Sequence, residues 1–322
     1  MREIGGYFEL DSYGGRHYYT DSIPLNCGRG CIKYLVELRK IKTIWLPDYM
    51  CNSVGKAFKD MGTKTFTYMV NENFLPEYDF ELNEEEWLFL NDYYGQLKNK
   101  DIEIALGRSN GRLIVDETQG FFNTPYEGVD TFFSCRKWFG VSDGAFLITG
   151  DGERLERKLD RDESHNRMEF VLGRFERTAS EYFEKASSNN SFFENEPAKK
   201  MSAITDNLLR AINYGDVINK RRENWDLMDY ELNTINNLDL NKPHVPFMYP
   251  LMIKKGDARF IRNELVKKKI YIPVLWPDVI ERVHNCTVAY KFASDILPLP
   301  IDQRYSKTDI KRVVESIREI VG

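Results

Sequence analysis

Two residues of this sequence carry side chains that suit one kind of chemistry. Lys137 lies in the segment Thr131–Gly144, seven residues beyond the end of an apolar, strand-like run, and its amine can form an imine with an aldehyde. Asp116 follows the apolar run Leu113–Val115 directly. An acid at the end of a strand can pair with a cationic ring nitrogen through a charge-assisted hydrogen bond. The two groups together indicate a ligand that combines an aldehyde with a protonated ring.

A third segment could hold a phosphate group. Cys27-Gly28-Arg29-Gly30 opens a helical pattern, and glycines let the backbone approach an anion that helix-start amides favour. Taken singly, each segment has an ordinary explanation: a surface lysine, a capping acid and a tight turn. The three segments in this order predict binding of pyridoxal 5'-phosphate (PLP), which carries an aldehyde, a ring nitrogen and a phosphate.

Composition excludes several other classes of protein. The 322 residues carry a net charge of −5 with mixed signs, which argues against a nucleic-acid partner. No run reaches membrane-spanning length, and the N-terminus lacks a signal-peptide pattern. The five cysteines are scattered and odd in number, which is typical of reduced thiols in a cytoplasmic protein, and no metal site is expected.

Short apolar runs alternate with amphipathic stretches up to about residue 150, which indicates an α/β domain with a mostly parallel sheet. Ligands of such sheets bind beyond the carboxyl ends of the strands, where Asp116 stands. The expected strands are 43–46, 64–69, 87–90, 112–115 and 145–148.

The rest of the chain is expected to be different in organisation. Residues 151–235 are charged and mostly helical, with a loop at Ser187–Ser191. A strand at 248–253, a helix at 256–268, a strand at 270–274 and a helix at 306–321 follow. We therefore expect a large domain over residues 1–235 and a small C-terminal α/β domain over residues 236–322.

These segments resemble the fold-type-I PLP enzymes and, within them, the sugar aminotransferases of the DegT/DnrJ/StrS family. The resemblance covers residues 22–320. It rests on Cys27–Gly30, Asp116-x-x-Gln119, Lys137-x5-Asp143-Gly144 and the Leu-Pro segment Ile296–Tyr305. It implies a fold-type-I large domain with a central seven-stranded type of sheet.

The resemblance also implies roles for individual residues. Lys137 would hold the cofactor and move protons, Asp116 would keep the ring nitrogen protonated, and Gln119 would contact the ring's phenolic oxygen. Ser134, three residues before Lys137, would add a hydroxyl to the cofactor site. Gly28, Arg29 and Gly30 would form the phosphate site.

Some positions depart from the family pattern. Cys51 stands where the family has an aromatic residue that stacks on PLP, so that ring is either absent or replaced by Tyr49, Tyr93 or Tyr94. The family's Asn-x-Arg element reaches the phosphate from the partner subunit. Its nearest counterpart here lacks the asparagine and offers Lys199 or Lys200.

The resemblance implies an aminotransferase that works as a homodimer with shared active sites. The amino donor would be an amino acid such as glutamate, and the acceptor a nucleotide-linked keto sugar. Two alternatives remain open: another PLP reaction, such as elimination or decarboxylation, and a non-catalytic binding protein on the same scaffold. A dinucleotide-binding protein is disfavoured, because Gly28-Arg29-Gly30 lacks the third glycine of that fingerprint.

Overall fold

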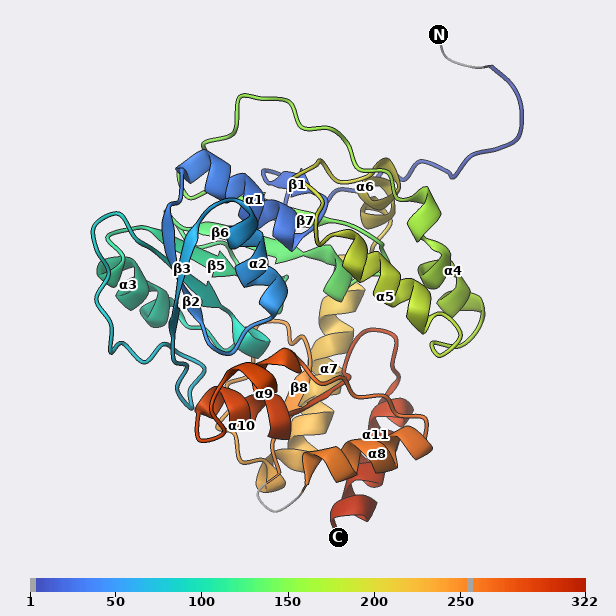
Figure 1. Ribbon diagram of the computed structural model, residues 1–322. Coiled ribbons are helices and arrows are strands. Elements are labelled where there is room, and N and C mark those ends of the chain that lie inside the picture. Colours follow the sequence, from blue (N-terminus) through green and yellow to red (C-terminus); the bar gives the residue numbers. More distant parts are fainter. Residues whose placement is uncertain (1–3, 254–256) are drawn as a thin grey trace.

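A seven-stranded sheet forms the centre of the large domain (Figure 1). The computed structural model describes residues 4–253 and 257–322. The strands lie in the order β1-β7-β6-β5-β4-β2-β3, and only β7 runs antiparallel to its neighbours. Their bounds are β1 Ile23–Leu25, β2 Thr43–Pro47, β3 Lys64–Tyr68, β4 Trp87–Asn91, β5 Leu113–Asp116, β6 Asp130–Ser134 and β7 Ala145–Ile148. The five strands expected from the sequence are confirmed within one or two residues.

The expected position of Lys137 relative to its strand was wrong. β6 continues to Ser134, so Lys137 comes three residues after the strand, at the end of a 3₁₀ turn over Cys135–Lys137. Thr131 to Ser134 pair in register with β7, which extends the strand beyond the apolar run read from the sequence. Lys137 is therefore held close to the carboxyl end of a central strand.

The central strands β4, β5 and β6 are buried on both faces, as in other parallel sheets. Phe132 packs in one cluster with α1 (Gly28–Arg39) and α2 (Asn52–Asp60), whereas Phe133 packs in another with Val217 of α7 (Tyr214–Leu232). Alternate residues of one strand thus serve opposite layers. α3 (Asn99–Arg108) packs at a third cluster with β4 and β5.

The C-terminal part has its own core. It contains β8 (Tyr249–Leu251), β9 (Leu297–Leu299), α8 (Ala258–Lys267), α9 (Asp278–Arg282), α10 (Val288–Asp295) and α11 (Lys307–Val321). β8 and β9 pair antiparallel, and the second half of α7 packs on them through Trp225, Met228 and Leu232. The expected strand at 270–274 was wrong: no strand forms there, and β8 pairs with the Leu-Pro segment instead. Residue 256, the expected start of the first helix, lies outside the described residues.

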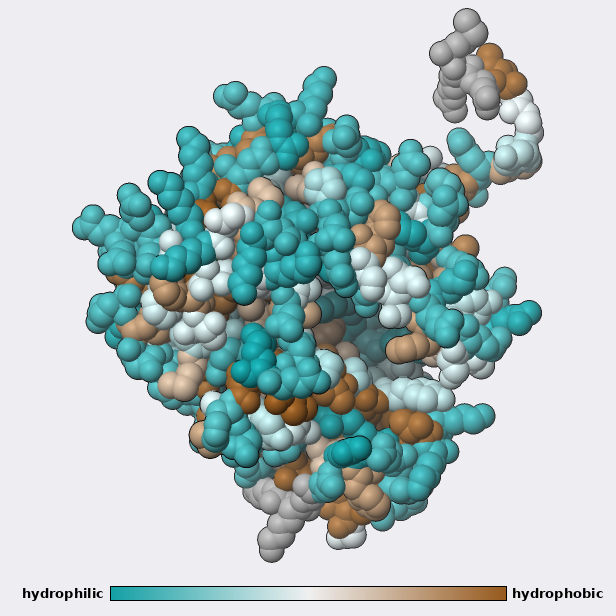
Figure 2. All heavy atoms as spheres, viewed as in Figure 1, coloured by the Kyte–Doolittle hydropathy of each residue, from teal (hydrophilic) through white to brown (hydrophobic). Residues whose placement is uncertain are grey.

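Along the sequence, three helices follow β7 and precede α7: α4 (Glu169–Glu176), α5 (Phe183–Phe192) and α6 (Ala203–Arg210). The expected loop at Ser187–Ser191 was wrong, because these residues form the second half of α5. Their polar composition reflects a location beside a pocket rather than a break in the helix. In Figure 2 the molecule is hollowed at its centre on the side viewed.

Candidate active site

A cavity of about 390 Å³ opens at the carboxyl ends of the central strands. Asn91 of β4, Asp116 of β5 and Ser134 of β6 line it together with Gly28 and Arg29 at the start of α1. Parallel strands place their last residues at one edge of the sheet, which is why Asn91, Asp116 and Ser134 meet here although they lie 18 to 43 positions apart in sequence.

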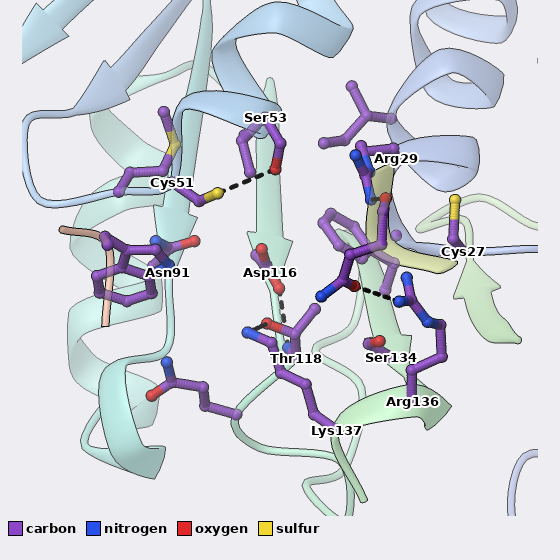
Figure 3. A pocket seen from close by; sticks show the side chains of 18 of the residues that line it. Cys27, Arg29, Cys51, Ser53, Asn91, Asp116, Thr118, Ser134, Arg136 and Lys137 are labelled. Carbon is purple, nitrogen blue, oxygen red and sulfur yellow. Dashed lines mark hydrogen bonds between the residues drawn. The ribbon is translucent and has the colours of Figure 1, made fainter. Parts of the chain in front are cut away.

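Lys137 and Asp116 lie at this cavity and share a neighbour, Thr118 (Figure 3). The Lys137 Nζ donates a hydrogen bond to the Thr118 hydroxyl at 3.2 Å, and the Thr118 backbone N–H donates to the Asp116 carboxylate at 2.8 Å. The Trp138 ring nitrogen in turn donates to the Thr118 carbonyl oxygen at 3.0 Å. Thr118 therefore fixes the amine and the acid relative to each other.

Burial alters the proton affinity of both groups. The Lys137 side chain is exposed to the cavity, but the surrounding protein limits its contact with water. This burial lowers the pKa of Lys137, and the negative charge of Asp116 opposes the shift. Burial raises the pKa of Asp116, and the Lys137 charge opposes that shift. A lysine with a lowered pKa has a larger fraction of neutral amine near neutral pH, which is the form that attacks an aldehyde.

Gln119 is buried and lines the same cavity. Its Oε1 accepts a hydrogen bond from the Tyr94 backbone N–H at 2.8 Å. This contact assigns the oxygen and leaves the amide Nε2 as a donor toward a ligand. Ser134 also lines the cavity, and its hydroxyl makes no hydrogen bond to the described residues.

The candidates for a stacking ring fall in different places. Cys51 lines the cavity, and its thiol lies 3.0 Å from the Ser53 hydroxyl. Tyr94 and Tyr49 are fully buried and do not border the cavity, whereas Tyr93 does. Trp276, from the C-terminal part, lines the cavity as well and packs edge-on against the Tyr93 ring. Tyr93 and Trp276 thus supply the aromatic surface that Cys51 lacks.

The start of α1 is the positive end of the cavity. The first turn of α1 contains no acidic residue, and the Cys27 thiol accepts the Gly30 N–H at 3.3 Å. Gly30 does not border the cavity; a Cβ atom there would lie 2.2 Å from the Asn26 side-chain oxygen. The second glycine therefore serves packing against Asn26, while Gly28 and Arg29 face the cavity.

Lys199 and Lys200 do not border the cavity. Lys199 pairs instead with Glu196 at 2.5 Å. The basic residues at the positive end are Arg29 and Arg136, and both contact Asn190 of α5.

Thr118, Arg136, Asn190 and Trp276 are among the residues of this site that sequence reasoning missed. Arg136 had a signal, because it directly precedes Lys137. Asn190 and Trp276 had none, because α5 and the loop before α9 reach the cavity only through the tertiary fold. Among the described residues there is no group of three or more potential metal ligands, and no helix is long and apolar enough to span a membrane.

No protein-family model and no curated protein sequence matches this chain. Solved structures do match its fold. The sugar aminotransferase CalS13 from Micromonospora echinospora superposes with a TM-score of 0.65 at 13% identity, covering 93% of this chain and 87% of that one. The chain has the fold of the sugar aminotransferases.

Two further structures agree. Spr1654 from Streptococcus pneumoniae, assigned as a sugar aminotransferase and solved in its PLP form, gives a TM-score of 0.66 at 12% identity over 93% of this chain and 86% of its own. A DegT/DnrJ/EryC1/StrS aminotransferase from Brucella abortus gives 0.61 at 13% identity, over 94% and 86%. The fold-type-I architecture expected from the sequence is confirmed.

Proposed function

We propose that this chain is a PLP-dependent aminotransferase. The observation that carries the proposal is the convergence of Lys137 and Asp116 on one cavity whose other end is positively charged. A fold shared with aminotransferases solved in PLP and pyridoxamine phosphate (PMP) forms supports the choice of cofactor.

The residues at the cavity fit this cofactor. Asp116 would accept a hydrogen bond from the ring nitrogen, and the free Nε2 of Gln119 would donate to the phenolic oxygen. Ser134 offers an unpaired hydroxyl, and Gly28 and Arg29 at the start of α1 would face the phosphate. Lys137 lies within reach of Thr118, so its amine is oriented before any ligand arrives.

When bound, PLP would supply an aldehyde that takes up an amino group and a ring that withdraws electrons. The protein's part is to orient and to move protons. Lys137 would form the covalent link and, once released, carry a proton to or from the substrate α-carbon. Asp116 would keep the ring nitrogen protonated, and Thr118 would hold the lysine amine on the correct side.

We further propose that the donor is an amino acid such as glutamate and that the acceptor is a keto sugar carried on a nucleotide. The names of the structural neighbours support the sugar part of this proposal. We also propose that the protein is a homodimer with shared active sites and that it works in the cytoplasm. The five cysteines, all free thiols, support the cytoplasmic location.

The test is to incubate the purified protein with PLP, reduce it with borohydride and map the modified peptide by mass spectrometry. We expect the cofactor on Lys137, and no modification in a Lys137→Ala variant. Addition of glutamate to the unreduced protein is expected to convert bound PLP to PMP in one turnover. Modification at another lysine, or no conversion with any amino donor, would contradict the proposal.

A further inference from the structure

Two arginines at the positive end of the cavity form no ion pair with residues 4–253 and 257–322. Arg29 projects from the first turn of α1, and Arg136 directly precedes Lys137 (Figure 3). Among the described residues no carboxylate lies within 4.0 Å of either guanidinium, although Glu194 borders the same cavity. Two neighbouring cations beside a positive helix end repel each other, so the arrangement is incomplete without an anion.

Asn190 of α5 brings the two arginines together. Its side-chain oxygen accepts a hydrogen bond from Arg136, and its backbone oxygen accepts one from Arg29 at 2.8 Å. Both guanidinium groups also lie over the Phe193 ring, at 4.7 Å for Arg136 and 6.0 Å for Arg29. The neighbouring Asn189 donates to the Ser142 carbonyl oxygen at 2.8 Å, which anchors α5 to the segment after Lys137.

The Arg136 side chain uses only part of its hydrogen-bonding capacity within the described residues. Asn190 is its one hydrogen-bonding partner in residues 4–253 and 257–322, and its buried Nε has no partner there. Burial lowers the pKa of Arg136 to about 10, and the charge of the neighbouring Arg29 acts in the same direction. A guanidinium that is poorly solvated, unpaired and next to a second guanidinium is suited to a doubly charged oxyanion, because it can donate to two oxygens at once.

We propose that Arg29 and Arg136 of the same chain clamp the phosphate of the cofactor against the first turn of α1, with Asn190 positioning both side chains. This inference rests on the proposed function and adds to it that the phosphate charge is neutralised in cis. No element equivalent to Asn-x-Arg is needed from a second chain, which fits the absence of that pattern around Lys199 and Lys200. The covalent link to Lys137 is unchanged by this assignment.

The experiment compares PLP with pyridoxal, which lacks the phosphate. Dissociation constants are measured with apo protein by the quenching of tryptophan fluorescence. We expect Arg136→Ala and Arg29→Ala each to weaken PLP binding about 10- to 100-fold and to leave pyridoxal affinity within about twofold. Arg174→Ala removes an equal charge from an exposed position on α4 and is expected to change neither.

Several outcomes decide the matter. If wild-type protein attaches PLP to Lys137 while both arginine variants bind PLP normally, the clamp is wrong and the proposed function stands. If wild type binds neither compound, the proposed function itself fails. Equal losses for PLP and pyridoxal would show a general packing role and overturn the clamp. Should Arg136→Ala not fold, as judged by thermal unfolding, Arg136→Lys replaces it, with a smaller loss expected for PLP alone.

A mixing experiment tests the cis arrangement. Chains carrying Arg136→Ala are co-expressed with chains carrying Lys137→Ala, and tight PLP attachment is measured after purification of the mixture. A clamp within one chain predicts no tight sites, because each chain lacks one of the two residues. Recovery of tight sites would show that Arg136 acts across a subunit interface and would overturn the cis assignment.

Discussion

Asp116 and Lys137 influence each other's charge at the cavity. Burial disfavours both ions, and each ion partly relieves the other. Thr118 keeps them close without joining them directly, since it accepts from the lysine and donates to the acid. A change of either group should therefore be visible in the titration of its neighbour.

Asp116→Asn should lower the pKa of Lys137 further, because the carboxylate raises it. The neutral amine would then predominate at a lower pH. We expect the rate of PLP attachment to apo protein, trapped with borohydride across a pH series, to reach half its maximum at a lower pH in the variant. Transamination should nevertheless slow about 10- to 100-fold, because the ring nitrogen loses its charged partner.

Asp151→Asn is the control for this prediction. It removes a carboxylate that is exposed and paired with Arg39, away from the cavity. Both the pH series and the turnover rate should match those of the wild type. A shift of the Asp116→Asn series to higher pH would contradict the electrostatic coupling.

The turn after Lys137 connects several elements that build the site. The Gly144 N–H donates to the Asn26 carbonyl oxygen at 2.5 Å, just before α1, and the Gly144 carbonyl oxygen accepts from the Cys135 N–H at 3.1 Å. Asp143 is fully buried and accepts hydrogen bonds from the Ser202 N–H and hydroxyl, both at 2.7 Å, and from the Thr205 hydroxyl. Asp143 and Gly144 therefore connect the turn that contains Lys137 to the start of α1 and to α6 through hydrogen bonds.

Asp143→Ala should lower the free energy of unfolding by about 2–4 kcal/mol, because three buried donors lose a charged acceptor. The substitution should also weaken PLP binding, because these hydrogen bonds hold the turn that contains Lys137 against the start of α1. Urea unfolding and fluorescence titration measure the two effects. Asp143→Asn keeps an acceptor oxygen and should lose less; equal losses in the two variants would argue against the hydrogen-bond explanation.

Some elements of this arrangement could be predicted from the sequence, and others could not. The parallel strands were readable because a strand buried on both faces appears as a short continuous apolar run, and Asp116 stood at the end of one. Residues 270–274 have a similar composition but form no strand, because Tyr271 and Val274 are exposed and β8 finds its partner in β9. Ser187 to Ser191 looked like a loop, since nothing local reveals that a polar stretch of helix will face a cavity. Arg136 and Asn190 meet only because the fold brings positions 54 residues apart together.

On the scale of the whole molecule, a buried pair of acids, one of which borders the cavity, makes stability depend on pH. Asp92 and Glu117 are both buried, and the Asn123 amide donates to each, at 3.0 and 3.1 Å. Burial raises the pKa of Asp92 to about 6, and burial together with the Asp92 charge raises the pKa of Glu117 well above its usual value. The folded protein therefore binds more protons than the unfolded chain above about pH 4, so stability should fall as pH rises through 6.

Glu117→Gln should reduce this dependence on pH. The variant removes one of the two titrating groups while keeping its size, so the drop in unfolding free energy between pH 5 and pH 8 is expected to shrink by on the order of 1–2 kcal/mol. Urea denaturation at the two pH values measures the drop. Glu315→Gln, at an exposed position of α11, should leave it unchanged. An unaltered drop in Glu117→Gln would mean that other groups dominate the titration.

The place of β1 in the sheet has a consequence for how the protein is made. β1 leads directly into α1, and its neighbour in the sheet is β7, which ends at Ile148. Arg29 therefore has no fixed position until the ribosome has released well over a hundred residues that follow it. Asn190 and Trp276 leave the ribosome later still. During synthesis the growing chain should carry exposed apolar strands for a long interval and be unable to capture its cofactor until nearly the whole polypeptide has emerged.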